Sequence, residues 1–587
     1  MYAPGVSDLK ADIVEALKEL AELTTLDEGS PQAFRVRAYE NAQRAVQAVS
    51  GDVAEMTEAQ LTKLDGIGKS TAKKIRQFID TGRIDKLDEL RAEYPRSVVE
   101  MSHIPGVGPK AVKKLRAELG IESVADLKKA IEEEKIRGLK GFGKKSEEKI
   151  AKSIERLGLD GKERRTPIAK ALPIALRLVD ELEQMAGVDK VRYCGSLRRF
   201  RETIGDLDIV VASNDSKPIM DWLVGLSMVS DVIVQGETKT SVLTHKGLQI
   251  DLRVVAPKQF GAACLYFTGS KAHNIKLRQR AMDKGWLLNE YALEEAETGK
   301  VVASETEEAI YEALGLPWIP EVLREDDGEI EAAEKGHLPR AIALDELAGD
   351  LHVHTDLSGD GRSPLEDMVA GAKARGYRFL AITEHAEDIP LQGVKRDALL
   401  AQREKIQALQ KELGDELTLL HGVELNIGPE GGLDYDHEFR MLFDWCLASV
   451  HTHFDLTQEQ QTQRIVKAME DPSVNMIGHL TARSIGKRPP IELDMPTVLE
   501  AAEKTRTGLE INSGLPRLDL PTSILRDARE RDVVFVMTSD AHHVSELDRM
   551  QWGVKQALRG WVDPDKVANL WSRERFLDWT KERRGRA

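Results

Sequence analysis

The strongest constraint on how this chain folds lies in its last 240 or so residues, where short apolar runs alternate with helical stretches. Six of these runs read as strands, and histidines and acids gather at their ends: RFLAITEH, LTLLHGVELNI, WCLASVHTH, NMIGHL, TGLEINSG and VVFVMTSDAHH. Strands that alternate with helices over this length predict a barrel of parallel strands. Such barrels build their sites at the carboxyl ends of the strands, so the polar ends of these runs indicate one common site.

Histidines are concentrated in the same region, since ten of the 14 in the chain lie after residue 350. A concentration of this kind favours metal binding over use in a core. The region opens with DLHVHTDLSGDGRS, in which His352 and His354 are two apart and therefore point to the same side of a strand. Two histidines by themselves are a weak signal, and a chance cluster is the alternative for this stretch alone.

The whole chain has 587 residues, enough for about four domains. Its three cysteines lie far apart, which indicates a reducing compartment and argues against a disulfide framework. The amino terminus, MYAPGVSDLK, lacks a signal pattern, and the sequence contains no apolar run of about 18 residues. We therefore expect a cytoplasmic protein with no membrane partner.

Charge is distributed unevenly along the chain. The net charge of −16 argues against a protein that coats DNA over its whole surface. Residues 101–170, however, hold 18 Lys and Arg against 11 Asp and Glu, which suggests a localised nucleic-acid surface. A solvated helical face is the alternative. Residues 321–334 hold seven acids and one base, a composition typical of a linker between domains.

Three segments in the first 160 residues repeat one pattern: DGIGKSTAKKI, PGVGPKAVKKL and KGFGKKSEEKI. Each has two glycines around an apolar residue and then a basic run, and the helical periodicity around them predicts an all-helical region. Paired glycines permit a tight turn and a close approach of the backbone, and the free amides that open the next helix suit a phosphate. The paired glycines are Gly66 and Gly68, Gly106 and Gly108, and Gly141 and Gly143.

These repeats resemble the helix-hairpin-helix motif, which grips the DNA backbone without reading bases. A single pair of glycines is equally typical of a plain turn between two helices. Three copies, each followed by lysines, favour DNA binding.

Carboxylates gather in the middle of the chain. The stretch VRYCGSLRRFRETIGDLDIVV reads as two strands with a turn after the first. Asp206 and Asp208 are two apart on the second strand and share one face, and Asp251 in GLQIDLRVV occupies a similar strand position. Three clustered acids need cations, and two Mg²⁺ ions are the cations suited to phosphoryl transfer.

GSLRR followed by GDLDIV resembles the nucleotidyltransferase signature of family X DNA polymerases, the polymerase-beta-like repair enzymes, and LYFTGSKAHNIKLR resembles their nucleotide pocket. The resemblance covers about residues 1–320. It implies that Asp206 and Asp208 bind both Mg²⁺ or Mn²⁺ ions and that Asp251 holds the catalytic one. The other implied contacts are Gly195, Ser196, Arg199 and Arg165 for the triphosphate, Tyr266, Phe267 and Gly269 for the sugar, Asn274 for the base and Arg278 for the template side.

In animal members of this family the first hairpin domain also removes a 5′-deoxyribose phosphate through a lysine Schiff base, and Lys74 matches that lysine. A lysine in this role needs a lowered pKa, from burial or from neighbouring cations. Arg35, Tyr39 and Lys86 resemble the 5′-phosphate pocket of the family, whereas Ser70 stands where another lysine is expected. The sequence therefore leaves the lyase activity open.

The histidine-rich region resembles the PHP (polymerase and histidinol phosphatase) family over about residues 348–560. This resemblance implies a distorted (β/α)7 barrel around three divalent metals, Zn²⁺ or Mn²⁺ or both, ions that suit mixed nitrogen and carboxylate ligands. Arg517 is a candidate for binding substrate phosphate. Every ligand position of the family is filled in this sequence, by His352, His354, Asp360, His385, Glu424, His451, His479, Asp540 and His542.

Together these regions predict a multidomain protein. Its expected parts are a helical DNA-binding, lyase-like domain at 1–90, a fingers-like helical domain with helix-hairpin-helix motifs at 91–160, an α/β nucleotidyltransferase palm at 161–260, a nucleotide-binding thumb at 261–321, a linker at 322–347 and a PHP phosphoesterase domain at 348–587.

The resemblances imply a monomeric bacterial enzyme of the cytosol or nucleoid that uses deoxynucleoside triphosphates to fill short gaps in gapped or nicked DNA during repair. The PHP domain would act as a 3′–5′ exonuclease or 3′-end-processing phosphodiesterase, with cleavage at abasic sites as a further activity. Two alternatives stay open: a PHP domain that is only a scaffold, and a DNA end-binding protein with phosphatase activity.

Overall fold

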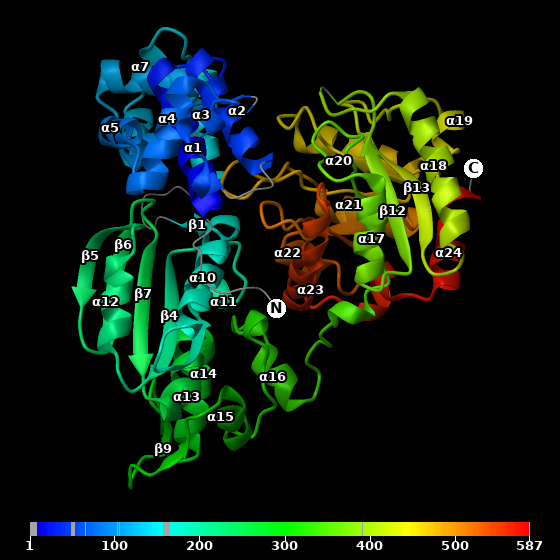
Figure 1. Cartoon of the computed structure of the whole chain (residues 1–587). Coiled ribbons are helices and arrows are strands. Elements are labelled where there is room, and N and C mark those ends of the chain that lie inside the picture. Colours follow the sequence, from blue (N-terminus) through cyan, green and yellow to red (C-terminus); the bar gives the residue numbers. More distant parts are fainter. Residues whose placement is uncertain are drawn as a thin grey trace. The chain divides into compact units, whose positions relative to one another are not determined.

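The computed structural model describes residues 9–48, 53–64, 66–102, 104, 106–156, 165–389 and 391–585 (Figure 1). The chain forms two compact units, one built mainly on the residues before 165 and the other on those after it. Among the described residues, no helix is both long and apolar enough to cross a membrane.

The described residues before 157 are helical, as the sequence predicts. The helices are α1 (Leu9–Glu28), α2 (Phe34–Ala48), α3 (Glu58–Leu61), α4 (Lys69–Thr81), α5 (Asp85–Glu93), α6 (Arg96–Ser102), α7 (Pro109–Leu119), α8 (Val124–Glu132) and α9 (Lys144–Arg156), with short 3-10 turns at Val53–Glu55 and Ile136–Gly138. Their apolar faces form two cores, one containing Leu17 and Ile75 and the other Leu20 and Leu115.

The glycine pairs form the turns that lead into α4, α7 and α9. The first glycine of each pair has a positive φ, which glycine adopts without strain: 87° at Gly66, 94° at Gly106 and 92° at Gly141. Gly68 and Gly108 directly precede the first residues of α4 and α7 and cap those helices. Ile67 and Val107 are buried between the glycines, so the apolar residue of each of these two turns anchors it in a core.

A five-stranded sheet, ordered β2-β4-β7-β6-β5, forms the palm. Strand β4 runs parallel to β7 and antiparallel to β2. The strands are β2 (Val188–Tyr193), β4 (Asp206–Ser213), β5 (Val229–Gln235), β6 (Lys239–Thr244) and β7 (Gln249–Val255), accompanied by α10 (Ile168–Glu183), α11 (Gly195–Arg198), α12 (Lys217–Gly225) and the small pair β1 (Thr166–Pro167) and β3 (Thr203–Ile204).

The thumb follows the palm and contains a three-stranded antiparallel sheet ordered β10-β9-β8. Its elements are the 3-10 turn Pro257–Gln259, α13 (Phe260–Thr268), α14 (Lys271–Asp283), β8 (Trp286–Leu288), β9 (Leu293–Glu295), β10 (Val301–Ala303) and α15 (Glu307–Ala313). The 3-10 turn Glu321–Leu323 and helix α16 (Glu329–Glu334) come next in the chain.

The acidic segment expected as a linker at 322–347 is folded at its start, which corrects that expectation. Arg324 is fully buried, and its guanidinium pairs with the Glu307 carboxylate at 2.7 Å. Glu329 is also fully buried and pairs with His273 at 2.6 Å. These two contacts attach the segment to the thumb. The high charge content was misleading because part of it is paired inside the fold instead of solvated.

Seven parallel strands in sequence order form the barrel domain, as the PHP resemblance implies. The strands are β11 (Gly349–Val353), β12 (Phe379–His385), β13 (Thr418–Asn426), β14 (Trp445–Ser449), β15 (Met476–Ile477), β16 (Gly508–Asn512) and β17 (Phe535–Thr538). A parallel bridge between Val353 and Ala541 joins the first strand to the segment after the last and closes the barrel.

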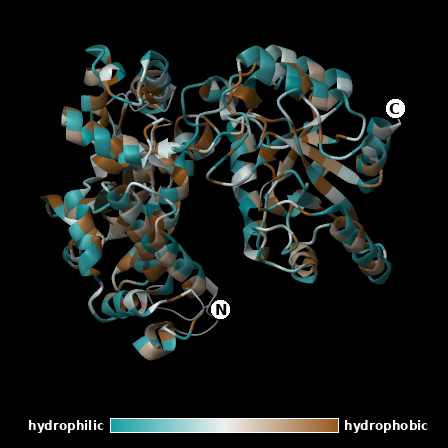
Figure 2. Cartoon of the chain, turned by 90° about the horizontal axis from the view of Figure 1, so that it is seen from above, coloured by the Kyte–Doolittle hydropathy of each residue, from teal (hydrophilic) through white to brown (hydrophobic). Residues whose placement is uncertain are grey.

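Helices surround these strands. They are α17 (Leu365–Ala374), α18 (Arg396–Leu413), α19 (His437–Arg440), α20 (Gln458–Glu470), α21 (Met495–Thr505), α22 (Thr522–Asp527), α23 (Met550–Arg559) and α24 (Arg573–Arg584), with 3-10 turns at Leu344–Glu346, Val544–Arg549, Pro564–Lys566 and Ala568–Leu570. Figure 2 shows hydrophilic and hydrophobic segments alternating along these helices, as expected for helices with one face on a core.

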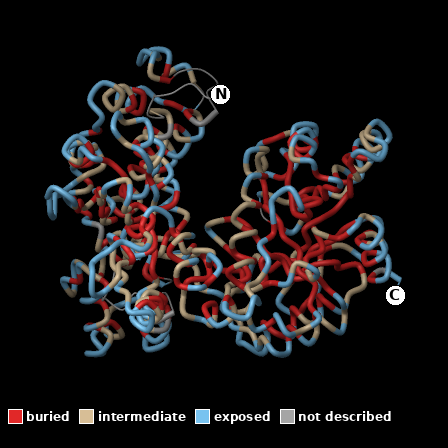
Figure 3. Tube along the Cα trace, turned by 90° about the horizontal axis from the view of Figure 1, so that it is seen from below, coloured by how far each residue is buried: buried red, intermediate tan, exposed pale blue. Residues whose placement is uncertain are grey.

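The interior of the barrel is layered. Alternate residues of a strand point into the barrel and toward the surrounding helices. In β12, Leu380 and Ile382 pack in the large core beneath the helices, while Phe379 and Ala381 pack in a smaller core with Phe576 of α24. Apolar side chains thus fill the amino-terminal half of the interior and leave the carboxyl ends to polar residues. Most residues of the seven strands are buried, and Figure 3 shows buried segments, in red, gathered at the centre of this domain.

Candidate active sites

The three palm carboxylates lie on neighbouring strands. Asp206 and Asp208 are on β4, and the parallel register places Asp208 directly opposite Asp251 on β7. Burial, followed by the charges of Asp206 and Asp251, raises the pKa of Asp208 to about 7. A shift of this size reflects crowded negative charge, which a bound cation relieves. The donor set, oxygen atoms at a partly open strand end, fits Mg²⁺ or Mn²⁺.

Lys239 is a palm residue that the sequence analysis missed. Its Nζ lies 2.6 Å from Oδ2 of Asp251, while Gln249 donates to Oδ1 at 2.8 Å. Burial alone would raise the pKa of Asp251, but these two hydrogen bonds hold it below its ordinary value. In the sequence, Lys239 is a single lysine at the start of the strand KTSVLT. No local pattern predicts which carboxylate it contacts.

The Gly195–Ser196 turn packs against the same carboxylates. Gly195 has a φ of 63°, and a Cβ at this position would lie 2.3 Å from Oδ2 of Asp208. The backbone N–H of Cys194 donates to the carbonyl oxygen of Asp208 at 2.7 Å. Only glycine fits this turn, and Ser196 follows it directly in α11.

The expected nucleotide-pocket segment is assembled where α13 meets α14. The guanidinium of Arg199 donates to the carbonyl oxygen of Thr268 and lies 3.2 Å from Glu325. A Cβ at Gly269 would come within 3.2 Å of that guanidinium, so the glycine leaves room for the arginine. Arg199 thus connects the palm turn to the pocket segment.

The rest of that segment is held by local contacts. Asn274 donates from Nδ2 to the carbonyl oxygen of Tyr266 at 2.8 Å, and Arg278 contacts the Asn274 carbonyl at 3.4 Å. The rings of Tyr266 and Phe267 meet edge to face with centroids 5.1 Å apart. Arg165 lies at the β1–β3 pair, where it donates to the Thr203 hydroxyl at 2.9 Å and the Thr203 carbonyl at 2.6 Å.

In the first helical unit, the structure brings together the residues of the expected 5′-phosphate pocket. Lys74 is half-buried, and its Nζ donates to the Ser70 hydroxyl at 2.9 Å. The same Nζ lies 5.9 Å from the centre of the Tyr39 ring. Burial, then the charges of Arg35, Lys73 and Lys86, lowers the pKa of Lys74. Ser70, which departs from the family pattern, is thus the direct partner of the candidate lysine.

In the barrel domain, eight of the nine expected ligands fall into groups whose donor atoms lie within 4.8 Å of one another. Glu424 on β13 is the centre of this arrangement. Its Oε1 lies 3.3 Å from His451 and 3.0 Å from His479, and its Oε2 lies 2.8 Å from His385. Oε2 is also 3.5 Å from His352 and 3.6 Å from His354.

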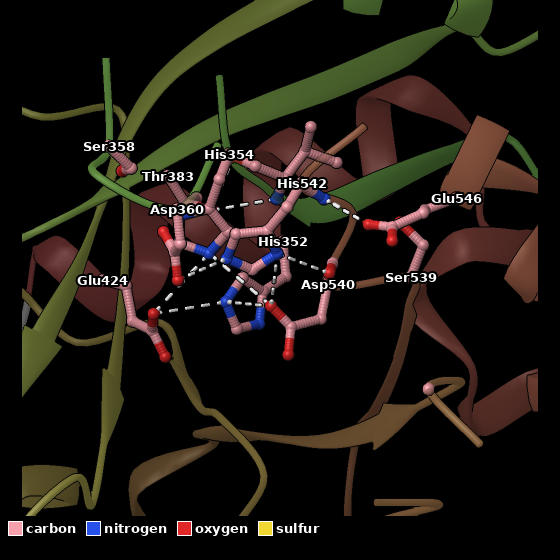
Figure 4. Close-up of polar contacts among 12 residues, drawn as sticks. His352, His354, Ser358, Asp360, Thr383, Glu424, Ser539, Asp540, His542 and Glu546 are labelled. Carbon is pink, nitrogen blue, oxygen red and sulfur yellow. Dashed lines mark hydrogen bonds and ion pairs between the residues drawn. The ribbon is translucent and has the colours of Figure 1, made fainter. Parts of the chain in front are cut away.

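Two further carboxylates complete the set (Figure 4). Asp540 Oδ1 lies 3.5 Å from Nε2 of His352 and 3.6 Å from Nε2 of His354. Asp360, the ninth expected ligand, contacts His385 at 3.4 Å and His542 at 3.3 Å through Oδ2. The structure therefore gathers every expected ligand into one polar cluster at the carboxyl ends of the strands.

The unpaired atoms of this cluster test whether it fits metal ions. Several buried atoms have no hydrogen-bond partner, and they include Nε2 of His352, both ring nitrogens of His354, Oδ1 of Asp360 and Oε2 of Glu424. Buried polar atoms without partners are costly, and they are explained when a cation is the partner. Mixed imidazole and carboxylate donors fit Zn²⁺ and Mn²⁺.

The pKa values of the cluster diverge. Burial opposes the charged form of His352, but Asp540 and Glu424 raise its pKa well above the ordinary value. Burial and the neighbouring His385 and His542 lower the pKa of His354 well below it. Neighbouring imidazoles that compete for protons around buried carboxylates form a site that divalent cations can neutralise.

Two more residues border the cluster. Arg517, the phosphate candidate, lies with Nε 3.6 Å from Oδ2 of Asp540. Glu510, fully buried on β16, accepts a hydrogen bond from Nδ1 of His352 at 2.6 Å, and the sequence analysis missed it. In the sequence, Glu510 is only an acid within the apolar run TGLEINSG. Its role cannot be inferred until the strands beside it are known.

Family models match four separate parts of the chain. They are a helix-hairpin-helix domain at residues 8–84, a SAM-like helix-hairpin-helix tandem at 98–156, a DNA polymerase beta thumb at 263–325 and a PHP domain at 350–514. The thumb match extends to residue 325 and therefore includes the buried Arg324.

Curated relatives resemble the chain over different extents. The DNA polymerase/3'-5' exonuclease PolX of Bacillus subtilis is 37% identical over 564 residues, which cover 95% of this chain and 97% of that protein. DNA polymerase lambda of Rattus norvegicus is 26% identical over 343 residues, 52% of the chain and 54% of that protein. A probable phosphatase of Vibrio parahaemolyticus is 26% identical over 242 residues, 40% of the chain and 92% of that protein.

Proposed function

Because the chain belongs to the family X DNA polymerases that carry a carboxyl-terminal PHP domain, we propose that its palm joins deoxynucleoside triphosphates to the 3′ ends of gapped or nicked DNA. The observation that carries this proposal is the opposition of Asp208 and Asp251 beside the Gly195–Ser196 turn. It unites a carboxylate set with a turn whose amides and hydroxyl suit a triphosphate.

Each part of the palm has a proposed task. Asp206, Asp208 and Asp251 would hold Mg²⁺ or Mn²⁺, which lowers the pKa of the primer hydroxyl and shields the charge of the triphosphate. Ser196 and Arg199 would bind the triphosphate. The stretch from Tyr266 to Gly269 would border the sugar, with Asn274 at the base and Arg278 toward the template. The glycine turns of the helical unit would hold the DNA backbone through their amides.

The barrel domain is proposed to hydrolyse phosphodiesters at 3′ ends. Its nine gathered side chains would hold Zn²⁺ or Mn²⁺, which supplies Lewis acidity and an activated water. Arg517, beside Asp540, would bind the scissile phosphate. A polymerase and a 3′ hydrolase act on the same terminus, and linkage in one chain raises the effective concentration of that terminus at each site.

Primer extension on gapped, 5′-phosphorylated DNA tests the palm proposal. The wild-type chain with Mg²⁺ or Mn²⁺ should add nucleotides, and Asp206→Asn/Asp208→Asn should not, while it retains 3′ hydrolysis. Failure of the wild-type chain to extend the primer, or undiminished extension by the double variant, overturns the proposal. That outcome would leave DNA end binding with phosphatase activity as the better description.

The same wild-type chain can be assayed on single-stranded DNA and on duplex DNA with an abasic site. If mononucleotides are released from 3′ ends faster than the abasic site is cleaved, the exonuclease assignment is supported. If the abasic site is cleaved faster, the domain is an endonuclease instead. No hydrolysis of either DNA with Mn²⁺ or Zn²⁺ would identify the barrel as a scaffold.

A lyase is the second candidate function, because the pKa of Lys74 is lowered in the manner that a Schiff-base lysine needs. Borohydride should trap the wild-type chain on DNA that carries a 5′-deoxyribose phosphate, and Lys74→Ala should trap little. Lys63→Ala, which removes an exposed lysine that is not among the charges acting on Lys74, is the matched control and should trap normally. Equal trapping by the two variants contradicts the assignment.

A further inference from the structure

None of the nine candidate metal ligands lies on strand β16 or on the turn that follows it. The other six strands and their turns supply all nine. Alternation along β16 nevertheless gives it two faces. Leu509 and Ile511 pack in the core beneath the helices, so Glu510 and Asn512 point into the barrel, toward the ligand cluster.

Glu510 contacts three segments that carry ligands. Oε1 accepts hydrogen bonds from Nδ1 of His352 and from the hydroxyl of Thr538, both at 2.6 Å. Oε2 accepts a hydrogen bond from the backbone N–H of His479. His352 lies on β11, His479 follows β15, and Thr538 is two residues before Asp540. A single buried carboxylate therefore joins the positions of three candidate ligands.

Asn512 acts on the same side of the cluster. Its Nδ2 donates to Oδ2 of Asp540 at 3.2 Å, and its Oδ1 accepts from the backbone N–H of Gly514 at 2.9 Å. The amide is thereby oriented with its donor toward the Asp540 carboxylate. Oδ1 of Asp540, the oxygen that faces His352 and His354, is left for a cation.

The hydrogen bond to His352 determines which ring nitrogen can bind a metal. A neutral imidazole has one N–H and one lone pair. The hydrogen-bond network places the N–H of His352 on Nδ1, because Glu510 is an acceptor there. The lone pair is then on Nε2, the atom that lies 3.5 Å from both Glu424 and Asp540 and has no hydrogen-bond partner.

We infer that Glu510 is a positioning residue of the PHP metal centre, which sets the tautomer and orientation of His352 and fixes the backbone at His479. Asn512 is its companion and orients Asp540. The inference rests on the proposed metal-dependent function of the barrel. It identifies β16 as the strand that supports the ligands instead of supplying one. Partners that accept the second N–H of a ligating histidine raise its basicity and restrict its ring.

Glu510→Gln is the test variant. Each oxygen of the Glu510 carboxylate accepts an N–H, that of the His352 ring at Oε1 and that of the His479 backbone at Oε2. A glutamine amide has one acceptor oxygen, so one of these donors would face an NH₂ group. Asp471→Asn is the matched control, because Asp471 also forms a partly buried ion pair in this domain, with Arg440 at 2.5 Å, but contacts no candidate ligand.

Zn²⁺ binding to the full chain gives a readout that does not depend on activity. Calorimetric titration in an Asp206→Asn/Asp208→Asn background leaves the barrel as the candidate Zn²⁺ site. Glu510→Gln should lower the apparent affinity about 10- to 100-fold, a range typical for loss of such a partner. It should also alter the visible spectrum of the Co²⁺-substituted chain. Asp471→Asn should change neither, although its melting temperature falls.

Glu510→Asp covers the case in which the glutamine variant does not fold. It retains the negative charge but moves it away from His352. We therefore expect a Zn²⁺ affinity between that of the parent, the Asp206→Asn/Asp208→Asn chain, and that of Glu510→Gln. An affinity within twofold of the parent together with a parental Co²⁺ spectrum, in either variant that folds, overturns the inference. A parent chain that binds Zn²⁺ tightly yet hydrolyses no DNA would refute the proposed function and leave the role of Glu510 intact.

Discussion

In the palm, three carboxylates come from two adjacent strands, and one of them, Asp206, is exposed. In the barrel, nine candidate ligands come from six strands and their turns, and most are buried. The palm cluster contains one lysine, Lys239, that neutralises Asp251 directly. The barrel cluster instead contains six histidines whose ring nitrogens face carboxylates.

This difference indicates two ways of holding cations. The palm resembles an open carboxylate edge, where Mg²⁺ keeps several waters and is completed by substrate phosphates. The barrel is a preformed set of nitrogen and oxygen donors supported from behind by Glu510 and Asn512. We therefore expect the palm to assemble its metal site with the nucleotide and the barrel to retain metal ions without substrate.

The largest expected effect separates the two sites. His352→Ala/His354→Ala should reduce 3′ hydrolysis by about a thousandfold or more, the scale seen when central catalytic groups are removed. Nucleotide addition on gapped DNA should remain within about twofold of wild type. Both rates are measured on the same 5′-labelled primer. Parallel loss of the two activities would show that the sites are not independent, and the comparison would fail.

A smaller effect is expected from Arg517→Ala. Loss of a charge-assisted contact to the scissile phosphate should slow 3′ hydrolysis about 10- to 100-fold, since such bonds contribute about 1.5–3 kcal/mol. Bound metal, measured by plasma mass spectrometry after gel filtration, should not change. Arg529→Ala, which removes an exposed arginine paired with Glu530, is the control. Loss of metal from the Arg517 variant would reassign this residue to support of Asp540.

The smallest expected effect concerns the stability of the palm. The pKa of Asp208 is about 7 in the fold against an ordinary value of 3.8. Between these values the folded chain holds a proton that the unfolded chain loses, so this group lowers stability as pH rises through that window, and its full cost is present above about pH 7.

Asp208→Asn removes that cost. In metal-free buffer it should raise the melting temperature of the palm more at pH 8 than at pH 4, as measured by differential scanning calorimetry. Mg²⁺ should reduce the difference from wild type, because the cation relieves the same repulsion. Asp221→Asn changes an exposed acid on α12 and should show no such pH dependence. An equal gain at both pH values would contradict the raised pKa.

Much of both sites follows from spacing along single strands and from resemblance. His352 and His354, like Asp206 and Asp208, are two apart, and the strand period puts each pair on one face whatever surrounds it. The glycine turns were equally accessible, because Gly66, Gly106 and Gly141 need a backbone conformation that few other residues adopt. These are local properties, and the structure shows each at the expected kind of element.

The contacts that the sequence analysis missed join residues on different strands. Lys239 reaches Asp251 across neighbouring strands, and Glu510 reaches His352 across 158 positions. The start of the expected linker was wrong for the same reason. The charged composition around Arg324 suggested a solvated segment, whereas the structure buries Arg324 against Glu307. No local pattern distinguishes a charged residue with a buried partner from one in water.

The sequence by itself determined the order of the domains, the strand and turn positions that carry the chemistry, and the identities of the candidate ligands. Only the tertiary structure decided which charges neutralise one another, which ring nitrogen of His352 faces the cluster, and that β16 supports a site it does not itself ligate. The physical reason is that periodicity sets the direction of a side chain, whereas its partner, its solvation and hence its pKa depend on which strands the fold places beside it.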